Sequence, residues 1–125
     1  MNDGILTILI VEDEPALQTA YQMILSSQGY RVATANNGYE ALKEINKQEP
    51  DIVLLDYFMP KMDGKTFLQN FDHGSHPDLK IILTSNISDP SVIQEMQALG
   101  ITDHVLKADL SPMQLIDLVE RIAAL

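Results

Sequence analysis

Five short apolar runs, separated by segments with helical spacing, constrain the fold of this chain more than any other feature. The runs cover residues 5–11, 30–35, 51–56, 79–84 and 102–106. Between the first two runs, apolar residues at i, i+3 and i+4 spacing define one helix face, namely Leu17, Ala20, Tyr21, Ile24 and Leu25. Similar patterns begin at Gly64 and near the C-terminus, and shorter ones cover residues 38–48 and 90–99. This alternation favours a parallel sheet with helices on both faces.

Proline and glycine positions agree with this order. Pro15, Pro90 and Pro112 each follow an acidic residue or a serine, as is common for proline at the first position of a helix. Gly29 and Gly100 come just after helical segments, where a left-handed cap is often needed. With right-handed crossovers, we predict an α/β fold: a flavodoxin-like, doubly wound (βα)5 domain whose five-stranded parallel sheet has the order 2-1-3-4-5.

Length and composition limit the possible functions. The chain has 125 residues, which suits one domain over residues 1–125. Eight Lys and Arg against 18 Asp and Glu give a net charge of -10, which argues against direct nucleic-acid binding. The absence of Cys excludes disulfides, Cys-ligated zinc and thiol catalysis. No apolar run approaches the ~20 residues of a membrane span. We therefore expect a cytoplasmic domain that binds neither membrane nor nucleic acid directly.

The predicted strands end in polar residues at one edge of the sheet. Glu12 and Asp13 follow the first run, Asp56 and Thr84 end the third and fourth, and Lys107 follows the fifth. Ligand sites of such sheets lie outside the carboxyl ends of the strands. Clustered carboxylates need a compensating cation, and hard oxygen ligands suit Mg²⁺. With a hydroxyl and an ammonium opposite, the set is suited to phosphoryl chemistry at a nucleophilic carboxylate. Each residue alone has an ordinary structural interpretation, so their joint placement carries the hypothesis.

These residues resemble a known family. The segments Val11-Glu12-Asp13-Glu14, Leu54 to Gly64, Thr84-Ser85 and Val105-Leu106-Lys107 resemble the receiver domain of two-component response regulators, over essentially the whole chain. The Asp-x-x-Met-Pro-x-Met-Asp-Gly stretch that begins at Asp56 is the most specific part.

The resemblance implies a role for each matching residue at the acidic end. Asp56 matches the phosphoacceptor, which takes a phosphoryl group from a sensor histidine kinase or a phosphotransfer protein. Asp13 matches the direct Mg²⁺ ligand, and Glu12 the acid that acts mainly through metal-bound water. Phe58 matches the position whose backbone carbonyl completes the metal site. The domain would be a signalling switch rather than an enzyme, although receivers promote their own phosphorylation and dephosphorylation.

The match is incomplete at the residues that, in this family, respond to phosphorylation and transmit the signal, which we call the output side. Thr84 matches the switch hydroxyl that moves to the phosphoryl group, and Lys107 the ammonium that pairs with that group. His104 stands where the family usually has an aromatic residue that turns inward, and Ala108 where a proline with a cis peptide usually follows the lysine. We expect His104 to make a related rotation. We also expect a trans peptide after Lys107, because a non-proline cis bond costs roughly 2.5–4 kcal/mol.

Other functions stay open at this point. A Mg²⁺-dependent phosphatase or phosphotransferase with an aspartyl nucleophile would need a general acid where Phe58 stands. A flavin-binding module would need a phosphate loop in place of the first acids. A pseudo-receiver would bind partners without phosphorylation.

The chain ends directly after the last helical pattern, so we expect no output domain. The downstream protein partner is unknown. His73 and His76 lie in a polar loop, where we expect solvated side chains.

Overall fold

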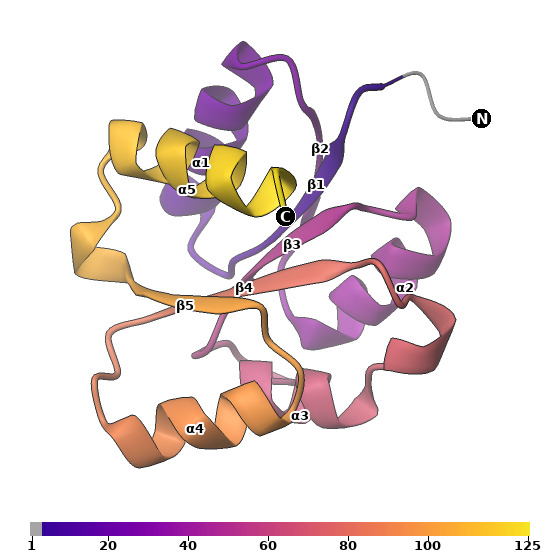
Figure 1. The fold of residues 1–125 in the computed structure, drawn as a ribbon, viewed down its shortest axis with the longest axis vertical. Helices are drawn as coiled ribbons and strands as arrows, with labels where there is room; N and C mark the ends of the chain where they lie inside the picture. The colour runs from indigo at the N-terminus through magenta and orange to yellow at the C-terminus, as the bar shows by residue number, and fades with distance from the viewer. Residues whose placement is uncertain (1–3) are drawn as a thin grey trace.

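A computed structural model describes residues 4–125 and shows a parallel sheet between two layers of helices (Figure 1). The five strands lie in the order β2-β1-β3-β4-β5, which confirms the predicted fold and strand order. All neighbouring strands pair in parallel. Their bounds are β1 (Thr7–Val11), β2 (Arg31–Ala35), β3 (Ile52–Asp56), β4 (Lys80–Ser85) and β5 (Asp103–Leu106).

The helices begin where the sequence signals predict. They are α1 (Pro15–Ser27), α2 (Gly38–Gln48), α3 (Gly64–Asn70), α4 (Pro90–Ala98) and α5 (Pro112–Ala123). Pro15, Pro90 and Pro112 each occupy the first turn, and Ser111 caps α5 by accepting a hydrogen bond from the Gln114 N–H. Two short 3₁₀ helices, η1 (His73–Ser75) and η2 (Lys107–Asp109), were not predicted, because segments of three residues are too short to show a period.

The helices cover both faces of the sheet. In Figure 1, α1 and α5 lie on one face, and α2, α3 and α4 lie on the other. Successive strand residues point to opposite faces, so the core forms two clusters. One packs strand residues such as Ile8 and Leu54 against α1 and α5, and the other packs Leu9 and Leu55 against α2, α3 and α4. Central strands β1 and β3 are thus fixed from both sides, and their carboxyl ends carry Glu12 and Asp56.

In the α3–β4 loop His73 is exposed, as expected, and His76 is half-buried, but both rings also contact Phe71. The ring of His73 lies edge-on to Phe71, with centroids 4.6 Å apart, and the ring of His76 stacks on Phe71 at 5.5 Å. His73 also covers Gly100, whose φ is +100°, so that a Cβ there would lie 2.5 Å from His73 Cε1. The loop therefore packs on the α4–β5 turn, because η1 folds both imidazoles back over a buried phenylalanine.

Candidate functional site

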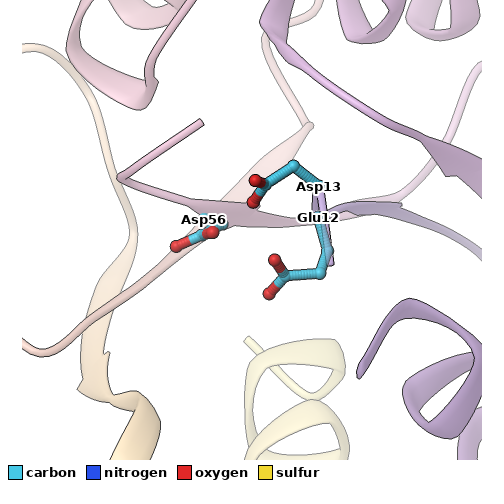
Figure 2. Close-up of side chains that lie close together, drawn as sticks. All are labelled: Glu12, Asp13 and Asp56. Atoms are coloured by element: carbon cyan, nitrogen blue, oxygen red, sulfur yellow. The ribbon is translucent and has the colours of Figure 1, made fainter. Parts of the chain in front are cut away.

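Three carboxylates lie close together at the carboxyl ends of β1 and β3, as Figure 2 shows. Glu12 and Asp13 follow β1 directly, and Asp56 is the last residue of β3. One oxygen from each residue lies within 4.8 Å of one oxygen of the others. Glu12 is only 2% exposed and Asp56 only 4%, whereas Asp13 is exposed. The acidic cluster predicted from the strand ends is therefore present.

Lys107 supplies positive charge to this cluster from the end of β5. Its Nζ donates to Glu12 Oε1 at 2.8 Å and lies 3.2 Å from Asp56 Oδ2. The other carboxylate oxygen of Glu12 accepts a hydrogen bond from the Glu14 N–H at 3.2 Å. One ammonium thus contacts two of the three carboxylates, which leaves the cluster with excess negative charge.

Burial and this excess charge change the protonation of the cluster. Burial, followed by the negative charge of Glu12, raises the pKa of Asp56 from 3.8 to about 7, against the opposing charge of Lys107. Burial acts to lower the pKa of Lys107, but its hydrogen bonds and charge interactions with Glu12 and Asp56 outweigh that effect and raise it. Near neutral pH, Asp56 is therefore poised to lose its proton when further positive charge arrives.

The last residue of β4 and the residues that follow β3 and β4 complete the wall of a pocket of about 400 Å³. Its lining consists of Glu12, Asp13, Glu14, Asp56, Phe58, Ser85, Asn86 and Lys107. Thr84 pairs with Asp56 across the sheet, but its hydroxyl donates to the Leu55 carbonyl at 3.4 Å. Ser85 and Asn86, which directly follow Thr84, form the wall on that side. Their position after a strand end was the only signal in the sequence for this role.

Phe58 places an apolar ring at the mouth of the pocket. Its side chain is 63% exposed, and its ring lies edge-on to Tyr57 with centroids 4.9 Å apart. A phenylalanine has no proton to give, so the general acid that an aspartyl phosphatase needs is missing at this position.

The two positions that depart from the family pattern both bond to the pocket wall. His104 Nε2 lies 2.9 Å from Ser85 Oγ, and the Ala108 N–H donates to Asn86 Oδ1 at 3.2 Å. Residues 4–125 contain no cis peptide bond, so the bond after Lys107 is trans, as expected. Burial lowers the pKa of His104, against the charge of Asp103. His104 thus contacts the last residue of β4 through its ring nitrogen.

Comparison with known proteins identifies the family. The model of the response regulator receiver domain matches residues 8–122, so the chain belongs to this family. It is a receiver domain of two-component systems, and its pocket of Glu12, Asp13 and Asp56 fits the phosphoacceptor site of such domains. Receiver domains bind Mg²⁺ through acidic residues of this kind.

Particular relatives agree with this assignment. Sporulation initiation phosphotransferase F of Bacillus subtilis is 32% identical over 100 residues, which are 80% of each chain. Transcriptional regulatory protein AfsQ1 of Streptomyces coelicolor is 34% identical over 81% of this chain and 44% of its own length. Chemotaxis protein CheY4 of Vibrio cholerae superposes with a TM-score of 0.88 at 28% identity, covering 95% of this chain and 99% of that one. The chain spans less than half of the first curated regulators that it matches. Within residues 4–125, no helix has the length and apolarity needed to cross a membrane.

Proposed function

We propose that Asp56 accepts a phosphoryl group from the phosphohistidine of a sensor histidine kinase or a phosphotransfer protein. The observation that carries this proposal is the buried Asp56 carboxylate, which has Lys107 Nζ at 3.2 Å and two further acids beside it. In the transfer, a carboxylate oxygen of Asp56 attacks phosphorus and an O–P bond forms. The P–N bond of the donor breaks, and its electron pair stays on the imidazole nitrogen.

The donor set of the pocket fits Mg²⁺, because it consists of oxygen ligands with excess negative charge. By the family pattern, Asp13 and Asp56 would be direct ligands, Glu12 would act through water, and the Phe58 backbone carbonyl would complete the set. When bound, Mg²⁺ supplies positive charge that offsets the charge of the phosphoryl oxygens. Lys107 is placed to pair with one of those oxygens, which favours the loaded state.

The proposal also covers how the signal leaves the domain. We assign Thr84 and His104 to the change of conformation that follows loading of Asp56, and a protein of unknown identity as the downstream partner. The net charge of -10 supports protein rather than nucleic-acid contact. The proposed role is that of a cytoplasmic switch in a single receiver domain over residues 1–125, not of an enzyme that turns over a separate substrate. The presence of Glu12, Asp13, Asp56 and Lys107 in one pocket supports a phosphorylated switch over a phosphorylation-independent module.

Acetyl phosphate tests the chemistry directly. With Mg²⁺ and acetyl phosphate, intact-mass spectrometry should show one added phosphoryl group, and Asp56→Asn should abolish it. Asp13→Asn should slow labelling and weaken Mg²⁺ binding. Asp78→Asn, which changes an exposed acid in the loop before β4, serves as the matched control and should label like the wild type. Full labelling of Asp56→Asn would move the acceptor elsewhere and overturn the assignment.

A further inference from the structure

Gln18, on the second turn of α1, holds the ends of β1 and β2 together. Its side-chain Nε2 lies 2.9 Å from the Glu12 carbonyl, 3.2 Å from the Ala35 carbonyl and 3.0 Å from Asn36 Oδ1. All three neighbours are oxygen acceptors, which defines this end of the amide as the donor. Asn36 is oriented in turn, because its Nδ2 donates to Glu40 Oε1 at 3.0 Å. A polar network therefore connects α1, the two strand ends and α2.

The Glu12 carbonyl belongs to the peptide bond that joins the two acids of the site. Because that peptide is planar, fixing its oxygen fixes the direction in which the backbone continues into Asp13. The N–H of Glu12 donates to the Ala35 carbonyl at 3.1 Å, so the same acceptor is shared by Glu12 and Gln18. The backbone is thus held on both sides of Glu12.

Asp13 depends on this backbone support more than Glu12 does. The Glu12 side chain has Lys107 and the Glu14 N–H as partners. Asp13 is exposed, and within residues 4–125 no hydrogen bond ties down its carboxylate. The bonding between β1 and β2 reaches the Glu12 N–H, and within residues 4–125 it does not extend to Asp13. Repulsion from Glu12 and Asp56 acts to move the free carboxylate away.

We propose that Gln18 is a positioning residue for the cation site: it holds the Glu12–Asp13 peptide so that both carboxylates converge with Asp56. This inference rests on the proposed function, since it assumes that the acidic cluster binds Mg²⁺. Loss of a partner that orients a metal ligand typically costs 10- to 100-fold in metal affinity. Gln18 acts through the backbone, so we expect an effect of about tenfold, at the lower end of that range.

Gln18→Met tests the proposal, because methionine keeps the length and apolar body of glutamine but has no N–H donor. The matched control is Gln48→Met, which makes the same change at an exposed glutamine whose side chain, within residues 4–125, bonds to Glu44 of its own helix. The Mg²⁺ dissociation constant would be measured by NMR titration of backbone amides, and melting of the metal-free proteins would show that each variant folds. We expect Gln18→Met to bind Mg²⁺ about tenfold more weakly and Gln48→Met to match the wild type.

A second variant separates positioning from charge. Gln18→Arg restores N–H donors, and should bind Mg²⁺ more tightly than Gln18→Met although its positive charge alone would weaken binding. At saturating Mg²⁺, Gln18→Met should be phosphorylated by acetyl phosphate at close to the wild-type rate. Equal Mg²⁺ affinity of Gln18→Met and wild type would overturn the inference and leave the proposed function intact. If the wild type binds no Mg²⁺ at all, both are wrong.

Discussion

Asp56→Asn should stabilise the metal-free protein near neutral pH, although it removes the proposed phosphoacceptor. Asparagine keeps the shape of the side chain and removes its charge. In the wild type, burial and the charge of Glu12 raise the pKa of Asp56 from 3.8 to about 7. Since each pKa unit corresponds to ~1.4 kcal/mol, folding with Asp56 ionised costs on the order of 4 kcal/mol. Lys107 loses a charged partner in the variant, so we expect a net gain of about 1–3 kcal/mol.

The stability difference between Asp56→Asn and the wild type should depend on pH in a defined direction. A group whose pKa is raised by folding stabilises the protein at low pH, and that contribution is lost as pH rises to the folded pKa. The stability advantage of Asp56→Asn over the wild type should therefore grow from about pH 4 to 7 and stay level above that value. For a domain of this size, the expected gain corresponds to roughly 5–15 °C in Tm.

Thermal unfolding followed by circular dichroism, with EDTA present, measures this difference between about pH 5 and 8.5. Asp78→Asn controls for the loss of one negative charge at an exposed site and should shift Tm little at any pH. Excess Mg²⁺ should reduce the Tm difference between Asp56→Asn and the wild type, because Mg²⁺ favours ionised Asp56 in the wild type. A variant no more stable than the wild type at pH near 8, or a gap that does not change with pH, would refute the reasoning.

Three further predictions concern Phe58 at the mouth of the pocket, His104 on the output side, and Gly100 at the opposite end of the fold. Phe58→Asn should shorten the half-life of the phosphorylated protein several-fold, because the exposed ring hinders the water that hydrolyses it; equal half-lives in a decay assay would exclude the ring from the mechanism. Burial lowers the pKa of His104. With beryllofluoride bound, the NMR chemical shifts of β5 in the wild type should therefore titrate below the usual imidazole pKa of ~6.5, and those of His104→Tyr should not titrate. Identical pH responses of the two proteins would contradict a role for the His104 ring. Gly100→Ala should cost about 1–3 kcal/mol in thermal unfolding, more than Gly29→Ala, because both glycines have positive φ but only Gly100 is covered, by His73. Equal losses would show that this packing contributes nothing.

The parallel sheet and the meeting of Glu12, Asp56 and Lys107 at one edge could be predicted from periodicity, and the strand order from the flavodoxin-like fold that the alternation suggests. Alternating runs imply parallel strands, and parallel strands bring their carboxyl ends to one edge. The pocket wall was harder to predict. Thr84 and Ser85 are neighbours with similar side chains, and only the packing shows that Thr84 bonds the Leu55 carbonyl while Ser85 lines the pocket.

Contacts between polar residues that are far apart in the sequence were even harder to predict. Gln18 lies beside the apolar stripe of its helix, where a polar residue is ordinarily solvent-facing. Its bonds to two strand ends depend on how α1 packs across β1 and β2. The packing of His73 and His76 on Phe71 likewise depends on a turn that has no period of its own.

The bonds from His104 to Ser85 and from Ala108 to Asn86 also have a consequence for divergence among receivers. A proline at position 108 has no N–H to give, and a phenylalanine at position 104 has no ring nitrogen. Changing His104 alone to phenylalanine would remove one of two partners of the buried Ser85 hydroxyl, which also accepts from the Ile87 N–H, and this is costlier than removing both groups together. Asn86 is exposed, so water can replace its bond to the Ala108 N–H. Positions 85 and 104 should therefore covary among relatives, and positions 86 and 108 more weakly. In grafting experiments between receivers, positions 85 and 104 are therefore best transferred together.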